Sequence, residues 1–186
     1  MTADSLEKTT GPEPAYRRAG RDDVPALVGL VNSCYRGDAS RQGWTTEADL
    51  LDGRRVDAEG MTALVERADT LVLVAEVDGV LAACCELQRG TSDAYFGMFS
   101  VRPDIQGGGL GRRVLAEAER TAAQKWGCRL MRMKVIKQRP ELIAWYERRG
   151  YTCTGRTEPF PYGNEAFGVP RRDDLEFVEL IRELSA

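Results

Sequence analysis

The sequence contains no histidine. This absence excludes Ser-His-Asp and Cys-His nucleophile mechanisms and every zinc site that uses an imidazole ligand. Acid–base chemistry in this chain must therefore come from carboxylates, tyrosine, lysine, cysteine, the backbone or water.

A long hydrophobic run and a cysteine framework are missing as well. No apolar stretch approaches the roughly 20 residues that a membrane-spanning helix needs, and residues 1–10 lack the basic start and apolar centre of a secretory signal. The 5 cysteines are odd in number and have no metal-ligand spacing, which favours reduced thiols in a cytoplasmic protein over disulfides. We expect no metal site and no membrane association.

The chain has 186 residues, of which 42% are hydrophobic and 30% charged. These values predict one globular domain over residues 15–186, after a polar, disordered tail over residues 1–14. A net charge of −3 argues against a nucleic-acid partner. Residues 102–149 carry a local charge of +7, so the remainder carries −10. The basic segment suits a compact polyanion such as a nucleotide cofactor, although a solvated arginine-rich helix face would give the same count.

Hydrophobic spacing and turn residues predict a mixed α/β domain. Asp78-Gly79 is a strong two-residue hairpin signal between two apolar runs. Strands are expected over residues 15–19, 71–77, 80–87, 95–101, 128–136, 151–157 and 175–181. Helices are expected over about 23–35, 47–51, 59–67, 109–126 and 140–150.

The strongest motif is the glycine-rich stretch from Gly107 to Gly111, between an expected strand and an amphipathic helix. Four of its five residues are glycine, so the backbone can turn tightly and approach a ligand closely. Free N–H groups at a helix N-terminus point at an anion, and Arg112 and Arg113 add positive charge in the first turn. The stretch predicts a phosphate site, with a surface turn that binds no ligand as the alternative.

Two common phosphate motifs do not fit this stretch. A P-loop requires Lys and then Ser or Thr after its last glycine, whereas Arg112 and Arg113 follow here. The dinucleotide fingerprint requires a third small residue where Val114 stands. It also requires a parallel βαβ unit, which we do not expect after an antiparallel meander.

Two motifs together resemble a known family. The pattern Gln106-x-x-Gly109-x-Gly111, after a strand that ends in Phe99-Ser100-Val101, closely resembles the acyl-CoA loop of the GNAT superfamily of N-acetyltransferases. Residues 142–151, with the pairs Trp145-Tyr146 and Gly150-Tyr151, resemble the helix-to-strand motif of that superfamily. The resemblance covers roughly residues 15–184. It implies a GNAT-like α/β fold, a mostly antiparallel sheet of six to seven strands that is flanked by helices and splayed at the acyl-CoA site.

The resemblance also implies acetyl-CoA as the acyl donor, a primary amine as the acceptor, and a set of donor-binding residues. Arg113 is added to this set for its charge. Arg139 stands where many members carry an asparagine that touches the cofactor, so it is expected either to reach a cofactor phosphate or to flank a helix. The implied residues are Phe99, Ser100, Val101, Gln106, Gly107, Gly108, Gly109, Leu110, Gly111, Arg112, Arg113 and Arg139.

Tyr146 aligns with a tyrosine of the family motif. The resemblance implies that this residue is the general acid, which protonates the departing CoA thiolate. A phenol with a pKa of about 10 can hydrogen-bond to such a thiolate. Tyr146 also lies four residues after Leu142 on a short amphipathic helix, which simple core packing would explain. The match to the family motif favours the catalytic interpretation.

The general base is less clearly marked. Many family members carry a glutamate on the splayed strand, but residues 95–101 contain no acid. Glu86 on the preceding strand is the candidate, with Glu76 behind it, and a solvated strand carboxylate is the alternative for both. Cys84 and Cys85 have no histidine to activate them, so we expect packing roles for them and direct amine attack in a ternary complex.

The acceptor site is expected among aromatic residues of the variable segments, namely Tyr35, Trp44, Tyr95 and Phe160. Each of these side chains could equally be packing. The charge of −10 outside the basic segment favours a cationic acceptor, such as a polyamine-like amine or a peptide lysine. A non-catalytic acyl-CoA-binding sensor on the same fold is the alternative function. Dimers are common among the proteins that the chain resembles, so a homodimer is a further expectation.

Overall fold

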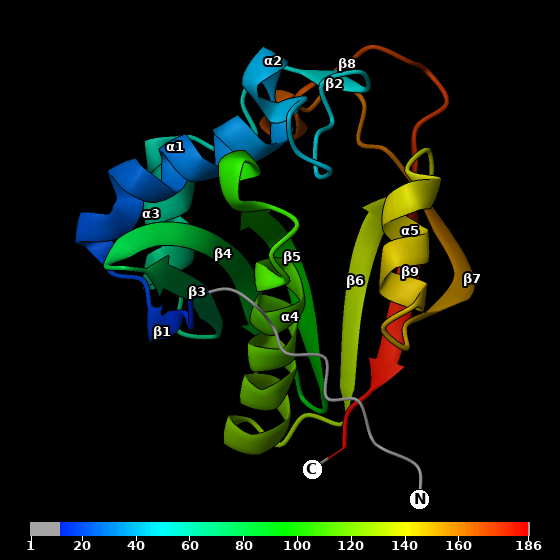
Figure 1. Cartoon of the computed structure of the whole chain (residues 1–186). Coiled ribbons are helices and arrows are strands. Elements are labelled where there is room, and N and C mark those ends of the chain that lie inside the picture. The colour runs from blue at the N-terminus through cyan, green and yellow to red at the C-terminus, as the bar shows by residue number, and fades with distance from the viewer. Residues whose placement is uncertain (1–11, 186) are drawn as a thin grey trace, which may run out of the picture.

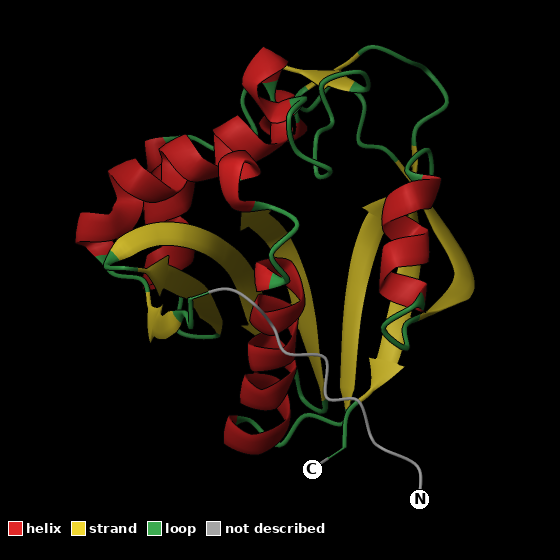
Figure 2. Ribbon diagram, viewed as in Figure 1, coloured by secondary structure: helices red, strands yellow, loops and turns green. Residues whose placement is uncertain are grey.

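The computed structural model describes residues 12–185 of the chain. Most of the tail predicted over residues 1–14 lies outside this described part. A seven-stranded sheet with the order β1-β3-β4-β5-β6-β9-β7 forms the centre of the fold, and helices lie on both of its faces (Figures 1 and 2). The prediction of a mixed α/β fold with a mostly antiparallel sheet is confirmed.

The elements follow the predicted order. The strands are β1 (Ala15–Arg18), β2 (Leu51–Asp52), β3 (Thr70–Val77), β4 (Val80–Arg89), β5 (Asp93–Val101), β6 (Leu130–Ile136), β7 (Thr152–Pro159), β8 (Val169–Pro170) and β9 (Glu176–Glu183). The helices are α1 (Val24–Tyr35), α2 (Gly37–Ser40), α3 (Ala58–Glu66), α4 (Leu110–Arg120) and α5 (Pro140–Glu147). None of the helices within residues 12–185 is long and apolar enough to cross a membrane.

Local sequence signals explain the main turns. Asp78 and Gly79 both have positive φ, 52° and 75°, as the two-residue hairpin between β3 and β4 requires. Helix α4 continues through a π-helical turn over Thr121–Lys125 and stops at Gly127, whose φ of 68° is left-handed. The hairpin and the long helix were both predicted from these residues.

The sheet separates two hydrophobic cores. Helices α4 and α5 pack on one face, where Val114, Leu115 and Tyr146 are buried, and helices α1 and α3 pack on the other. Cys85 belongs to the first core and Cys84 to the second, because successive side chains of a strand point to opposite faces. Both thiols are buried, which agrees with the packing role predicted for them.

Strands β5 and β6 are parallel neighbours over only three residue pairs, Asp93–Tyr95 against Leu130–Arg132. Opposite β4, strand β5 carries one extra residue near Met98, whose φ is 49°. A bulge of this kind bends a strand and increases its twist. Beyond Tyr95 the two strands therefore diverge, and the sheet opens into the V that Figure 1 shows. This opening is the splay that the family resemblance implied.

Two local predictions were wrong. Strands β5 and β6, joined by α4, form a parallel crossover, so the parallel βαβ context that we did not expect is present. The mismatch at Val114 still distinguishes the loop from the dinucleotide fingerprint. The helix predicted over residues 47–51 is a set of turns that leads into β2, which pairs with β8. A distant partner strand, invisible to local spacing, determines the structure there.

Candidate active site

The glycine-rich loop joins the end of β5 to the start of α4. Gly107 and Gly109 have φ values of 94° and 78°, a conformation that residues with a side chain rarely adopt. A side chain at Gly111 would lie 3.3 Å from the ring of Phe99, so glycine also permits close packing of the helix on β5. Arg112 and Arg113 follow in the first turn of α4. The loop thus brings backbone N–H groups and two cations to one helix end, as an anion site requires.

The side chain of Gln106 fixes this loop in place. Its Nε2 donates to the carbonyl oxygen of Val101 at 2.8 Å, and its Oε1 accepts from the backbone N–H of Trp44 at 2.9 Å. Gln106 therefore connects the glycine-rich loop to the end of β5 and to the segment between α2 and β2. That segment hangs over the open end of the V in Figure 1.

The edge of β5 that faces the V has no partner strand beyond Tyr95. The hydroxyl of Tyr35 on α1 donates to the carbonyl oxygen of Phe99 at 2.5 Å. The backbone N–H of Arg102 donates to Ala82 on β4 at 2.9 Å. Successive N–H groups of a strand alternate in direction, so the N–H of Val101 points away from β4 and toward the V. This edge can offer main-chain hydrogen bonds to an extended ligand.

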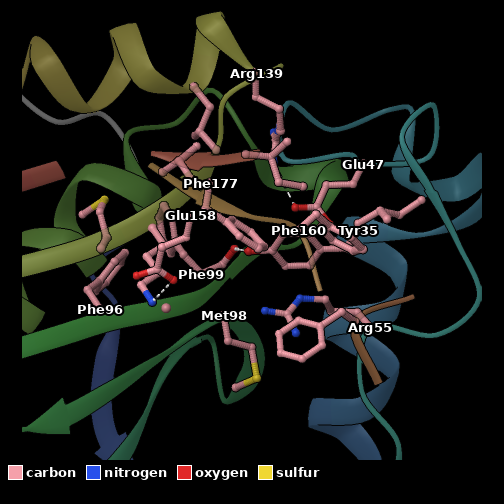
Figure 3. Close-up of a pocket in the computed structure, with 18 of the residues that line it drawn as sticks. Tyr35, Glu47, Arg55, Phe96, Met98, Phe99, Arg139, Glu158, Phe160 and Phe177 are labelled. Carbon is pink, nitrogen blue, oxygen red and sulfur yellow. Dashed lines mark hydrogen bonds and ion pairs between the residues drawn. The ribbon is translucent and has the colours of Figure 1, made fainter. Parts of the chain in front are cut away.

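A cavity of about 560 Å³ opens between the diverging strands. It is bounded by β5 on one side, by β6 and the β7–β9 region on the other, and by the end of α1 (Figure 3). Its aromatic lining includes three of the four predicted acceptor residues, Tyr35, Tyr95 and Phe160. The other aromatic residues of the lining are Phe96, Phe99, Tyr146, Phe167 and Phe177.

Tyr146 lies on α5 with its ring edge-on to Phe96, Trp145 and Tyr151. Although only 4% of the residue is exposed, it lines the cavity. No side-chain hydrogen bond joins its hydroxyl to another group within residues 12–185, whereas the hydroxyl of Tyr151 donates to Glu119 at 2.8 Å. Burial raises the pKa of Tyr146 well above 10, so the phenol is protonated at neutral pH. Tyr146 therefore keeps a free O–H donor at the cavity wall.

The two candidate bases, Glu76 and Glu86, differ in their ion pairing and in their position relative to the cavity. Glu76 pairs with Arg17 at 2.6 Å, next to the edge strand β1 and away from the cavity. Glu86 lies on the α1 face of β4 opposite Gly97 of the cavity wall, and it forms no ion pair within the described residues. Burial raises the pKa of Glu86 above the ordinary 4.5, and Arg55 opposes this rise. Glu86 does not itself line the cavity.

Trp44 and Arg139 lie on opposite sides of the cavity wall. Trp44 does not line the cavity and stacks on Trp145 of α5 with ring centroids 4.9 Å apart, and a Cβ atom at Gly111 would lie 3.7 Å from its ring. Arg139 lines the cavity, donates to the carbonyl oxygen of Trp44 at 2.9 Å and directly precedes α5, as the helix-flanking alternative predicted. Its expected contact with a cofactor phosphate stays a prediction.

A buried ion-pair cluster supports the cavity wall. The carboxylate of Glu47 lies 2.6 Å from Arg36 and 3.7 Å from Arg139, and the side chains are 11%, 5% and 4% exposed. Two guanidinium groups thus share one carboxylate away from solvent. Nothing in the sequence pattern singled out Glu47, because it meets Arg36 and Arg139 only after the chain has folded.

The thiols of Cys84 and Cys85 are unsuited to nucleophilic attack. Burial raises the pKa of Cys84 to about 12 and that of Cys85 well above 9. The thiolate is the reactive form of cysteine, and neither residue lines the cavity. The geometry therefore favours a reaction without a covalent enzyme intermediate.

Solved structures of other proteins share this fold. One is the ribosomal-protein-S18-alanine N-acetyltransferase from Escherichia coli, with a TM-score of 0.68 at 17% identity, covering 93% of this chain and 95% of that one. A putative acetyltransferase from Salmonella typhimurium, solved with its cofactor acetyl-CoA, has a TM-score of 0.67 at 21% identity, with coverage of 94% and 95%. A putative phosphinothricin N-acetyltransferase has a TM-score of 0.68 at 22% identity, with coverage of 94% and 100%.

At these identities the likeness concerns the fold alone, and no curated protein matches the sequence significantly. The acetyltransferase (GNAT) family, however, matches residues 26–151, which is more than half of the chain. This match spans the bulged strand β5, the glycine-rich loop and the helix that carries Tyr146. The chain belongs to the acetyltransferase (GNAT) family.

Proposed function

We propose that the protein transfers the acetyl group of acetyl-CoA to a primary amine, by direct attack in a ternary complex. The observation that carries the proposal is the V between β5 and β6, which joins an anion-binding helix end to a cavity with a protonated tyrosine. Family membership supports the acyl transfer. The acetyl-CoA in the Salmonella structure supports the choice of donor.

The donor would lie along the α4 and α5 face of the V. The backbone of Gln106 through Arg112 would hold its pyrophosphate, with Arg113 as an added cation. The edge of β5 at Phe99 and Val101 would pair with the amide-containing arm mainly through its N–H groups, because the two carbonyl oxygens already accept from Tyr35 and Gln106. Ser100 between them pairs with Cys84 of β4. An N–H of this edge would also stabilise the oxyanion that forms at the thioester carbon.

Tyr146 would act as the general acid. When the amine nitrogen bonds to the acetyl carbon, the C–S bond breaks and the sulfur takes up a proton. The phenol of Tyr146 is protonated at neutral pH, since the pKa of an ordinary tyrosine is already about 10 and burial raises it further. Its hydroxyl would hydrogen-bond to the sulfur, pass the proton to it as the C–S bond breaks, and regain a proton from solvent afterwards.

Glu86 would accept the proton that the attacking amine loses. Its raised pKa makes the carboxylate a stronger base than an exposed glutamate, which is useful for an amine that must be deprotonated. The proton would travel through water, since Glu86 stands behind Gly97 and Tyr95 of the cavity wall. The raised thiol pKa values of Cys84 and Cys85 support direct attack over an acyl-cysteine route.

An amine acceptor agrees with the names of the structural neighbours. These neighbours are described as acting on a ribosomal-protein alanine and on phosphinothricin. The acceptor would enter the cavity from the α1 side, opposite the donor, where Tyr35, Tyr95 and Phe160 form its wall. Attack from that side leaves the thioester open to the amine and keeps the CoA moiety out of the acceptor's path.

The test is calorimetric titration with acetyl-CoA, followed by detection of free thiol against a panel of amines. Micromolar binding together with amine-dependent thiol release is the expected result. Binding without release for every amine would support the non-catalytic sensor instead. Absence of binding at millimolar acetyl-CoA would contradict the proposal as a whole.

A further inference from the structure

The charges around the cavity are opposite to those that a cationic acceptor would need. Five basic residues and two acidic ones line it. The basic residues are Arg36, Arg55, Arg132, Lys134 and Arg139, and the acidic ones are Glu47 and Glu158. Four of these five cations are paired with carboxylates, so the positive charge that a ligand would meet is mainly that of Arg55. The charge of −10 elsewhere in the chain is therefore not a property of this site.

Among these lining cations, Arg55 differs from the others. Arg36 and Arg139 share Glu47, Lys134 pairs with Glu158 at 2.6 Å, and Arg132 pairs with Asp93. Within residues 12–185, no carboxylate oxygen lies within 4.0 Å of the Arg55 guanidinium. Its guanidinium lies over the ring of Tyr35, whose centroid is 5.6 Å from Cζ, and its charge opposes the burial-induced rise in the pKa of the Glu86 carboxyl, which forms no ion pair with it. Arg55 can therefore offer its forked N–H donors to a ligand.

The backbone beneath Arg55 is held firmly. The side-chain oxygen of Asn32 on α1 accepts from the N–H of Arg55 at 2.7 Å and from that of Val56 at 3.3 Å. The amide nitrogen of Asn32 donates in turn to the carbonyl oxygen of Val56 at 2.9 Å. Figure 3 shows the resulting direction, with the guanidinium of Arg55 pointing toward the middle of the cavity. The cation is held there before any ligand binds.

Tyr35 connects this cation to the reacting edge of β5. Its ring face lies beside Arg55, and its hydroxyl donates to the carbonyl oxygen of Phe99 at 2.5 Å. Tyr35 thus contacts both the guanidinium, through its ring, and the β5 edge, through its hydroxyl. A ligand whose anionic group binds Arg55 would place an amino group a few bonds away near that edge. The rest of its body would meet Met98, Tyr95 and Phe160 in the apolar part of the cavity.

From this arrangement we infer that the acceptor is a small amino acid-like amine, whose carboxylate binds Arg55 and whose apolar side chain packs on the aromatic wall. Planar bidentate pairing of a guanidinium with a carboxylate provides both strength and orientation. The inference rests on the proposed amine acetylation and names its substrate class. It replaces the cationic acceptor expected from the overall charge.

The test compares acceptors that differ only in the carboxylate. The common L-amino acids are assayed by thiol release, and the best of them is compared with its carboxamide and with its decarboxylated amine. We expect kcat/KM to fall by about 100-fold when the acceptor lacks the carboxylate, because Arg55 would then lie in the cavity without an anionic partner. Spermidine and a peptide with a free N-terminal alanine should be poor acceptors.

Variants at Arg55 connect this preference to one side chain. Arg55→Met should lower kcat/KM for the amino acid by about 100-fold and change that for the decarboxylated amine by less than about 3-fold. Arg55→Lys should restore part of the loss, since lysine keeps the charge without the fork. Arg54→Ala is the matched control, because Arg54 is exposed and does not line the cavity. It should leave both kcat/KM values unchanged.

Three outcomes would overturn the inferred acceptor class without contradicting the proposed amine acetylation. Equal or better turnover of spermidine or the peptide would show that the carboxylate is not recognised. Equal losses for both acceptors in Arg55→Met would show a structural role only. Failure of every amino acid, with acetyl-CoA binding intact by calorimetry, would exclude the substrate class. Loss of acetyl-CoA binding itself would instead contradict the proposed function.

Discussion

The two sides of the V are built in different ways. On the α4 side, a single segment from Phe99 to Arg113 supplies a strand edge, a glycine-rich loop and a helix end, and its contacts are mainly backbone groups. On the α1 side, the cavity is assembled from side chains of α1, the β2 region, β5, β6 and the loop after β7. A backbone site binds a chemical feature shared by many ligands, whereas a side-chain site can change its ligand by single substitutions. The four predictions below test that contrast.

The largest effect is expected from Gly109→Glu. A side chain at φ 78° is strained by about 1–2 kcal/mol, and the carboxylate would face the bound phosphates. Acetyl-CoA affinity should fall by about 1,000-fold in calorimetry. Gly127→Glu is the control, because Gly127 is also left-handed, with φ 68°, and lies in open space at the other end of the helix. If both variants lost affinity equally, the loop would have no special part in donor binding.

Glu47→Gln tests the buried support of the acceptor side. It would leave the buried Arg36 without its ion-pair partner and Arg139 with only the 3.8 Å pair to the exposed Glu141, which costs about 3 kcal/mol of folding free energy. The melting temperature should fall by roughly 6–10 °C. In the control Glu141→Gln, the altered side chain is 64% exposed and lies 3.8 Å from Arg139, so the melting temperature should barely move. Equal melting temperatures for both variants would contradict the role of the cluster.

Tyr146→Phe should act on turnover alone. Removal of the phenol should lower kcat by about 100-fold, the usual contribution of a positioned acid, without changing acetyl-CoA affinity. Tyr151→Phe removes a hydroxyl that binds Glu119 outside the cavity, so it should cost about 1 kcal/mol of stability and leave kcat unchanged. An unchanged kcat in Tyr146→Phe would assign Tyr146 to packing.

Glu86→Gln should give the smallest effect, about a 10-fold loss of kcat/KM at neutral pH. A base must be deprotonated, and burial raises the pKa of Glu86. Wild-type activity should therefore fall, as the pH decreases, at a higher pH than an ordinary glutamate would give. This acid limb should vanish from the profile of Glu86→Gln. Glu76→Gln, which alters a glutamate paired with Arg17, should keep it.

The difference in construction also explains what the sequence could predict. The succession of the main strands and helices along the chain, the hairpin at Asp78-Gly79 and the glycine-rich loop depend on neighbours in the chain, and each was predicted. The contacts of Trp44 with Trp145 and of Arg139 with Trp44 and Glu47 join segments far apart in the sequence, and local patterns could not predict them. No sequence pattern singled out Arg55, because its position at the cavity depends on its contacts with Tyr35 and Asn32 of α1.

The stacked pair of Trp44 and Trp145 has an optical consequence. Two indole rings 4.9 Å apart couple their electronic transitions, so the pair contributes a near-ultraviolet circular dichroism signal that isolated rings lack. The backbone of Trp44 is bonded to Gln106 of the loop and to Arg139 of the cavity, so a ligand on either side that shifts these residues changes the ring geometry. The chain thereby carries an internal, label-free spectroscopic reporter between the glycine-rich loop and the cavity.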